Sequence, residues 1–196
     1  GIATTFFSAD GKKYIQEVFV SSPDNVMVIH IKATDGGLVA ASFKLKREKD
    51  AVVKTSGNNT ISLTGQIIDE DDAKSGPGGA HMKFAGELRL AATKGDISAE
   101  NDMLNVKNAK EIVVRLTAAT DYNINHLDFD RSVDPAETCK NILNATENIT
   151  IKKLKQRHLE EYQPVFNRVS LSLGADSLRS VQTDERLKAV KNGSID

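Results

Sequence analysis

Short stretches of alternating apolar and polar residues recur about every ten residues from residue 1 to residue 120, with turn residues between them. The turns include Asp10-Gly11, Gly36-Gly37 and Gly57-Asn58. An alternation with a period of two is typical of strands that bury one face, and no stretch of helical period interrupts it. Many short strands joined by tight turns predict an antiparallel β-sandwich, so we expect residues 1–120 to form one.

The alternation also assigns residues to faces of the expected strands. Strands are expected over residues 4–9, 13–21, 25–34, 38–46, 51–55, 59–68, 80–92, 97–99, 103–106 and 110–120. In the strand over 25–34, the larger apolar side chains fall on one face, which we expect to be the core face. These residues are Met27, Ile29, Ile31 and Ala33, whereas Val26, Val28, His30 and Lys32 lie on the opposite face.

The pattern changes to helical spacing after residue 120. Asp134-Pro135-Ala136-Glu137 predicts a helix start, because Asp is a good cap and Pro fits the first turn. This helix is expected to run to about Asn144, and Thr150 or Asn148 to cap the next one. Residues 121–196 are therefore expected to be a helical linker.

The second helix carries one apolar stripe at helical spacing, which we expect to be buried as a whole. Its members are Ile151, Leu154, His158, Tyr162, Phe166 and Val169. Pro164 interrupts the stripe and removes a backbone donor, so a kink or an early end is expected near Glu161.

The end of the chain adds two further elements. Val169, Leu171 and Leu173 alternate with serines, which predicts a short returning strand over 169–173. Thr183 is expected to cap a last short helix, and Asn192-Gly193 to end it.

Composition excludes several classes of partner. The 196 residues contain 26 Lys and Arg against 27 Asp and Glu, a net charge of -1, without a block of like charge. Nucleic acid and anionic membranes are therefore poor candidates as partners. A single cysteine, Cys139, rules out an internal disulfide and a thiolate metal cluster, and its helical context predicts a buried, unreactive side chain.

Candidate site residues have simpler structural explanations. His30, His81, His126 and His158 are scattered, whereas a metal site needs at least three converging ligands. The run Asp69 to Asp72 lacks calcium-loop spacing, so residues 69–79 are expected to be a solvated loop, with a cation site as the alternative. This loop, with His81 just after it, could border the cleft of a partner domain.

Asp121, Asp128 and Asp130 belong to a loop in which aspartates are expected to form turns and caps. The pattern N-x-[ST] begins at Asn58, Asn144, Asn148 and Asn192. It is a glycosylation site only in a eukaryotic secretory context, whereas a bacterial source is expected.

Six segments together resemble the N-terminal region of glycoside hydrolase family 95, whose known members include α-L-fucosidases. They are YIQEVFVSSPDNVMVIHIKA (14–33), HMKFAGELRL (81–90), LTAATDYN (116–123), DPAETC (134–139), LKQRHLEEYQPVFNRVSLSLG (154–174) and TDERLKAV (183–190). They occur in the family's order and cover most of the chain. The last two, as a linked pair after a β-rich region, are the most specific.

The resemblance implies a supersandwich-like β domain and linker helices that lead into an (α/α)6 barrel. In that family the barrel holds the acid and the base of an inverting hydrolysis. The barrel would follow residue 196, and the first strands of the sandwich would precede residue 1. We therefore expect an inactive, non-catalytic piece of a secreted or periplasmic fucosidase, without catalytic, cofactor-binding or metal-binding residues. Its partner would be the barrel of the same polypeptide, and the substrate of the whole enzyme a fucosylated glycan. His81, just after the loop over 69–79, could approach the mouth of this barrel.

Two other functions remain open from the sequence. The first is an independent carbohydrate-binding or adhesion module, although the chain has no Trp and only three Tyr to stack on sugar rings. The second is a protein–protein interaction sandwich. If the first strands are absent, an unpaired sheet edge also predicts self-association.

Overall fold

The structure is a computed structural model that describes residues 1–71, 76–171 and 180–194. The chain divides into two compact units, residues 1–162 and residues 163–196, which we describe separately.

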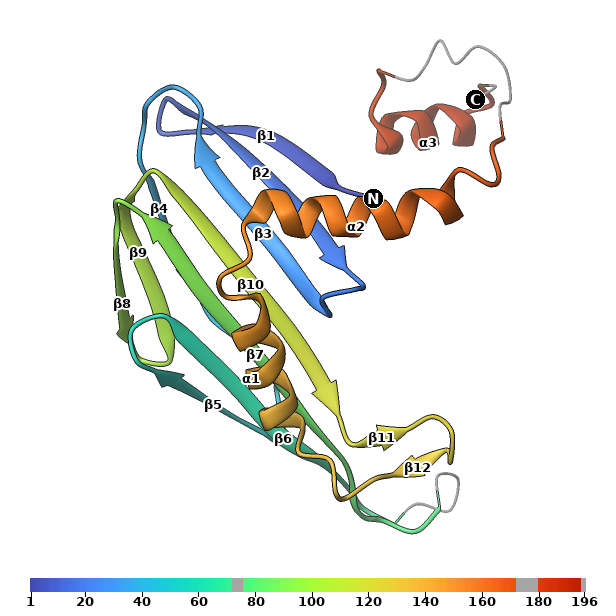
Figure 1. Ribbon diagram of the computed structural model, residues 1–196. Coiled ribbons are helices and arrows are strands. Elements are labelled where there is room, and N and C mark those ends of the chain that lie inside the picture. Colours follow the sequence, from blue (N-terminus) through green and yellow to red (C-terminus); the bar gives the residue numbers. More distant parts are fainter. Residues whose placement is uncertain (72–75, 172–179, 195–196) are drawn as a thin grey trace. The chain divides into compact units, whose positions relative to one another are not determined.

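Among the described residues, the largest sheet has seven antiparallel strands, in the spatial order β1-β2-β3-β10-β7-β6-β5. Their bounds are β1 (Ala3–Ala9), β2 (Lys12–Ser21), β3 (Val26–Ala33), β5 (Ala51–Ser56), β6 (Thr60–Asp69), β7 (Gly79–Thr93) and β10 (Glu111–Thr120). A three-stranded sheet has the order β4-β9-β8, with β4 (Val39–Phe43), β8 (Asp96–Glu100) and β9 (Met103–Ala109). A small hairpin pairs β11 (Tyr122–Asn123) with β12 (Asp128–Phe129). The helices are α1 (Pro135–Thr146), α2 (Ile151–Phe166) and α3 (Thr183–Lys191) (Figure 1). The antiparallel sandwich followed by helices is confirmed.

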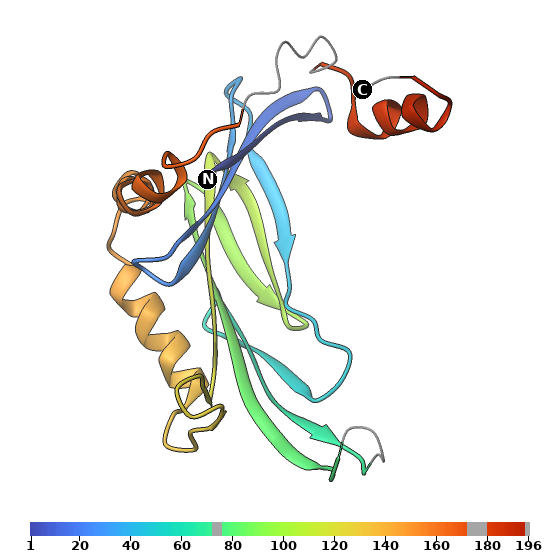
Figure 2. The same ribbon diagram turned by 90° about the vertical axis from the view of Figure 1, so that its right-hand side faces the viewer.

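Both faces of the large sheet are covered in the first unit. The three-stranded sheet packs on one face around a core that includes Ile61, Leu104 and Ile112. Residues of α1 and α2 pack on the other face, where Leu143 and Leu154 meet Phe19. Figure 2 shows the large sheet from its edge, with α1 on one side and the smaller sheet on the other.

This two-sided burial corrects the predicted faces of β3. Val26 and Val28 are fully buried against the helices, although they were expected to lie away from the core. Ile29 and Ile31 do face a core, that of the smaller sheet, but they are only partly buried. The prediction failed because it assumed that only one face of the strand is covered.

The first hairpin follows from its turn residues. Asp10 and Gly11 have φ values of 50° and 73°, so both central residues are left-handed, as a type I′ turn requires. Phe7 consequently pairs with Tyr14 across the β1–β2 ladder.

Helix α1 begins as predicted. The Asp134 carboxylate accepts hydrogen bonds from the backbone N–H of Ala136 at 2.9 Å and of Glu137 at 3.4 Å. Cys139 and Leu143 point into the sheet and are buried.

Helix α2 begins at the Thr150 cap, whose hydroxyl accepts from Lys153 N–H at 3.2 Å. Two ion pairs attach its first turns to the sheet: Lys155 with Glu17 at 2.6 Å, and Arg157 with Asp24 at 3.1 Å.

Two predictions about α2 need correction. The predicted early end near Glu161 is wrong, because the helix continues through Pro164 to Phe166; the alternative, a kink there, stays a prediction. Pro164 lies in the last turn, where the carbonyl that loses its donor belongs to the exposed Glu160 and can be hydrated. The predicted stripe is buried at Leu154 and His158, whereas Phe166 and Val169 are exposed.

The second unit differs from the prediction in two places. Gln182, not Thr183, precedes the first turn of α3, and it makes no side-chain capping bond. Residues 169–171 form no strand, because no neighbouring strand pairs with them, and residues 172 and 173 lie outside the described part. The predicted end of α3 is confirmed, with Asn192 as the cap and Gly193 at a φ of 90°.

Candidate functional site at the hairpin end of the sheet

Polar contacts and exposed apolar side chains lie together where β10 leaves the large sheet. We call this region the hairpin end. It consists of residues 121–133, which contain β11 and β12, together with the adjoining end of β6 and start of β7 (Figure 1).

Asp121 ties the hairpin to β7. Its side chain is fully buried, and its Oδ1 accepts from the backbone N–H of Lys83 at 2.8 Å. The backbone N–H of Asp121 in turn donates to the Lys83 carbonyl at 3.1 Å, and its carbonyl accepts from Asp130 N–H at 2.7 Å. A buried carboxylate is stable here because its oxygens have charged or N–H partners.

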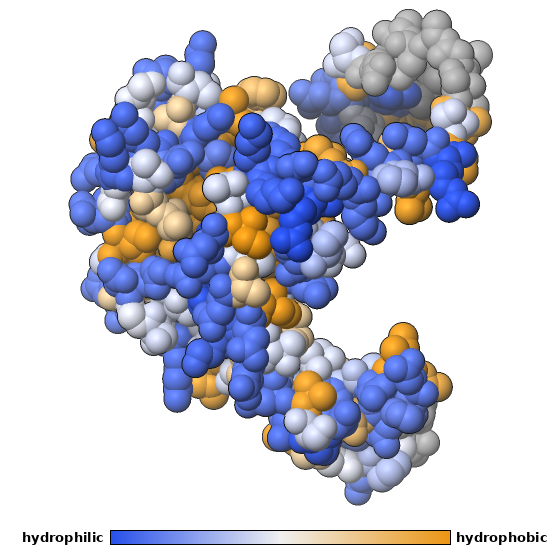
Figure 3. Space-filling model, in the orientation of Figure 1, coloured by the Kyte–Doolittle hydropathy of each residue, from blue (hydrophilic) through white to orange (hydrophobic). Residues whose placement is uncertain are grey.

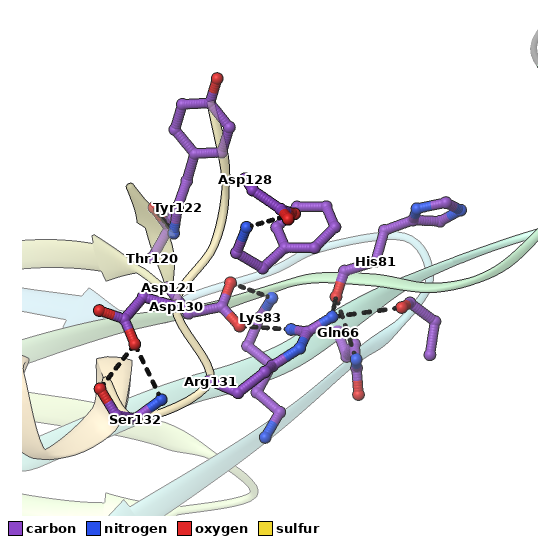
Figure 4. Close-up of polar contacts among 12 residues, drawn as sticks. Gln66, His81, Lys83, Thr120, Asp121, Tyr122, Asp128, Asp130, Arg131 and Ser132 are labelled. Atoms are coloured by element: carbon purple, nitrogen blue, oxygen red, sulfur yellow. Dashed lines mark hydrogen bonds and ion pairs between the residues drawn. The ribbon is translucent and has the colours of Figure 1, made fainter. Parts of the chain in front are cut away.

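Arg131 completes the connection. Its Nη1 forms an ion pair with Asp121 Oδ2, and its Nη2 donates to the backbone carbonyls of His81 at 2.9 Å and Ala80 at 3.3 Å. The guanidinium also lies over the Phe129 ring, 4.7 Å from its centroid. Figure 4 shows the guanidinium placed between Asp121 and the backbone of His81. One side chain thus fixes the hairpin to the start of β7.

His81 is placed at the same end, beside the polar loop. Its Nε2 lies 3.7 Å from Asp69 Oδ2, and its ring meets the edge of Phe129 at a centroid distance of 6.2 Å. Its backbone carbonyl also accepts from Gln66 Nε2 at 3.0 Å. The Asp69 to Asp72 run lies only partly within the described residues, which end at Asp71 and resume at Gly76.

The tip of the hairpin exposes apolar side chains. Ile124 and Leu127 are each 74% exposed, and Tyr122 is also exposed. Ile68, from the end of β6, adds another exposed side chain. Figure 3 shows apolar surface at this end of the first unit. Because the base of the hairpin is fixed while its tip is apolar, the arrangement suits contact with another protein surface.

The aspartates of the hairpin have structural roles, as predicted. Asp128 Oδ1 accepts from Phe129 N–H at 2.7 Å. The hydroxyl and the backbone N–H of Ser132 both donate to Asp130 Oδ1, at 2.6 and 3.1 Å. These bonds hold the pKa of the Asp130 carboxyl below its ordinary value. A leaving-group acid needs the opposite shift, so Asp130 is unsuited to that role.

The four histidines do not meet. His30 bonds to Glu111 at 2.9 Å, His81 lies near Asp69, His126 is exposed, and His158 bonds to the Gly1 carbonyl at 3.0 Å. Within the described ranges, no group of three or more His, Cys, Asp or Glu side chains is arranged to hold a metal ion.

Cys139 is buried, as predicted, and burial raises the pKa of its thiol to about 11. Its thiol contacts the Ala85 carbonyl oxygen at 3.6 Å, so it packs against β7 and is a poor nucleophile.

Two features of the site were not predicted. Arg131 was overlooked because a single arginine in a loop has no distinctive spacing, although its position ten residues after Asp121 places both at the base of one hairpin. The exposed Ile124 and Leu127 were overlooked because the segment was interpreted by its aspartates alone.

In the part of the chain that the structure describes, no helix combines the length and apolar character needed to cross a membrane.

Comparison with known families matches two consecutive parts of the chain. The profile of "Glycosyl hydrolase family 65, N-terminal domain" matches residues 1–125. The profile of "Glycosyl hydrolase family 95 catalytic domain" matches residues 150–196.

One curated protein and one solved structure are similar to the chain over most of its length. "Alpha-L-fucosidase 2" of Arabidopsis thaliana is 26% identical over 218 aligned residues, which include 97% of this chain and 25% of that protein. The chain thus spans about a quarter of the length of this curated relative. Among solved structures, "Putative kojibiose phosphorylase from human microbiome" superposes with a TM-score of 0.48 at 10% identity, over 83% of this chain and 23% of that one. The predicted resemblance to family 95 is confirmed.

Proposed function

Because the chain belongs, over residues 1–125, to the family of glycosyl hydrolase family 65 N-terminal domains, we propose that it is the non-catalytic N-terminal part of an α-L-fucosidase-like hydrolase. The whole enzyme would hydrolyse a fucosylated glycan with inversion, using an acid and a base in an (α/α)6 barrel of the same polypeptide.

The order of the two family matches carries this proposal. The N-terminal domain match ends at residue 125, and the catalytic domain match begins at residue 150, just before α2. The match to the catalytic domain therefore covers only α2, α3 and the residues between and around them. The titratable side chains at the hairpin end support the same view, since Asp121, Asp128 and Asp130 already serve as hydrogen-bond or ion-pair partners within the fold.

Within the whole enzyme we assign two roles to this part. The segment from Thr150 to Gly174 would support the helices of the barrel. The hairpin end would border the substrate cleft, since its base is fixed by Arg131 and its tip presents Tyr122, Ile124 and Leu127. We also propose a secreted or periplasmic location, which fractionation of the source cells would test.

Hydrolysis of 4-nitrophenyl α-L-fucoside tests the proposal. The purified chain of residues 1–196 should release nitrophenol at the rate of buffer alone, whereas the product of the complete reading frame should turn the substrate over. Turnover by residues 1–196 would end the non-catalytic assignment. A complete protein that is inactive on fucosides but active on another glycoside would end the fucosidase assignment.

A further inference from the structure

A recess lies between the tip of the β1–β2 hairpin and the start of β4. Its volume is about 280 Å³, and it is lined by residues that include Phe7, Tyr14, Leu38, Val39, Asp10 and Lys12. Ligand sites of proteins have volumes of roughly 300–1,000 Å³ and combine apolar walls with a few polar groups. The recess lies just below that range, so it suits a single ring.

Two aromatic rings form one wall. Phe7 and Tyr14 face each other across the ladder, with ring centroids 5.2 Å apart and an interplanar angle of 21°. Phe7 remains 39% exposed, so its ring is only partly covered. Its neighbour Phe6 points to the opposite face of β1 and is 74% exposed.

The second wall of the recess is formed by Leu38 and Val39 at the start of β4, a strand of the smaller sheet. The Tyr14 hydroxyl donates to the Leu38 carbonyl at 3.4 Å, which links β2 to the start of β4. The hydroxyl oxygen keeps a lone pair that can accept a further hydrogen bond. Val39 and Ile31 belong to the main core cluster and close the floor, so the recess is part of a packed framework.

The rim carries one charge of each sign. Asp10 and Lys12 both line the recess, and among the described contacts neither side chain has a hydrogen-bond or ion-pair partner. Asp10 occupies the left-handed turn position, at a φ of 50°, which fixes its Cβ direction. A carboxylate and an ammonium at one rim can bond to neighbouring hydroxyl groups of an uncharged ligand.

We propose that this recess is a binding site for one pyranose residue of a glycan. The C–H face of the sugar stacks on Phe7, and its hydroxyl edge meets Asp10, Lys12 and the Tyr14 hydroxyl. Apolar ring faces stack on aromatic side chains, and hydroxyl groups need paired donors and acceptors, so a sugar matches both parts of the site. The choice of a sugar among small neutral rings rests on the proposed function.

A titration of ¹⁵N-labelled residues 1–196 with methyl α-L-fucopyranoside tests the site, with methyl β-D-galactopyranoside as a second probe. The expected result is a saturable shift of the Phe7, Asp10, Tyr14 and Leu38 amides with at least one probe, with a millimolar dissociation constant. Absence of saturable shifts with both probes, or shifts confined to other regions, would overturn the proposal.

Two variants test whether the sugar binds in the recess. Phe7→Ala should weaken binding at least about threefold, because it removes the stacking partner. Asp10→Asn keeps a residue that tolerates the left-handed turn and should weaken binding by a similar factor. Phe6→Ala, the matched control on the other face of β1, should bind as the unmodified chain does. If Phe7→Ala does not fold, Asp10→Asn decides alone, and unchanged binding by it contradicts the site.

The result of the sugar-binding test can be distinguished from the result of the test of the proposed hydrolase function. Loss of sugar binding in Asp10→Asn with unchanged turnover by the complete enzyme would support the sugar site. An inactive complete protein whose residues 1–196 still bind the sugar would contradict the hydrolase and keep the site.

Discussion

Two buried carboxylates of the described chain are paired with arginines from other segments. Asp121 at the end of β10 pairs with Arg131, and Asp24, before β3, pairs with Arg157 of α2. An ion pair of this kind adds little net stability compared with an apolar pair, but removing one partner leaves an uncompensated buried charge. The cost of losing Arg131 or Arg157 should therefore exceed that of losing an exposed arginine.

Arg131→Met tests the stability cost of losing the ion pair with Asp121 at the hairpin end. The change leaves Asp121 buried without its cation and removes one hydrogen bond from each of two backbone carbonyls of β7, those of Ala80 and His81. We expect a loss of about 2 kcal/mol in the free energy of unfolding, less than for a fully buried pair because Arg131 is partly exposed. Urea unfolding followed by circular dichroism measures it. Arg131→Lys is the charge-retaining control and should lose less, and equal stability of the Met variant and the parent would contradict the role assigned to this pair.

Glu111 provides a pH-dependent contact between β10 and β3. Its hydrogen bond with His30, at 2.9 Å, lowers the pKa of the Glu111 carboxyl from 4.5, and Thr93 contributes a second bond. Because the folded-state pKa is depressed, the stabilisation is present above the unfolded pKa and is lost as pH falls through the folded one.

Glu111→Gln should therefore lower the free energy of unfolding by about 1 kcal/mol at pH 6. The difference from the parent should shrink as the pH falls below 4.5, measured by unfolding curves between pH 6 and pH 3. Asp96→Asn, at an exposed acid that forms no ion pair within the described residues, is the control. A difference that stays constant or widens toward pH 3 would refute the contact.

At the scale of elements, α2 is held by its first turns. Leu154 is fully buried against Phe19 and Val113, whereas Val165 near the other end of the helix is exposed. Leu154→Ala should cost about 2–4 kcal/mol in the free energy of unfolding, because it leaves a cavity beneath the helix. Val165→Ala should change it by less than about 0.5 kcal/mol. Thermal or urea unfolding of both variants measures the contrast, and similar losses would show that α2 does not pack as described.

The strand β1 is an edge of the large sheet, and its sequence ATTFFSA carries no charge. Unprotected edges pair with other chains, so concentration-dependent self-association is predicted for residues 1–196. Thr5→Lys should reduce it, because lysines on an edge oppose further pairing. Sedimentation velocity over a range of concentrations decides, and a monomer at all concentrations would contradict the prediction.

The sequence allowed the strands and turns to be predicted closely, because glycine and aspartate turns punctuate a regular alternation. The Asp10-Gly11 hairpin and the Asp134 cap show how local chemistry sets such boundaries. The faces of β3 could not be predicted, since alternation does not show that helices cover the second face. The Arg131 contacts could not be predicted either, because they depend on where residues 80 and 81 lie in space.

At the scale of the whole molecule, we propose that residues 1–196 position other residues of the enzyme and do not themselves catalyse. The sheet holds the hairpin end through Asp121 and Arg131, and the accessible ionisable groups there include His81, Asp128 and Asp130. If any of these took part in proton transfer, its removal should slow turnover by roughly 10²–10⁴-fold.

The most direct measurement is the kcat of the complete enzyme on 4-nitrophenyl α-L-fucoside after the combined replacement His81→Gln, Asp128→Asn and Asp130→Asn. These residues keep hydrogen-bonding ability but lose the capacity to exchange a proton near neutral pH. We predict a kcat within about twofold of the parent, with any change confined to KM. A loss in kcat of about 100-fold or more, in a variant with unchanged circular dichroism and unfolding midpoint, would contradict the account.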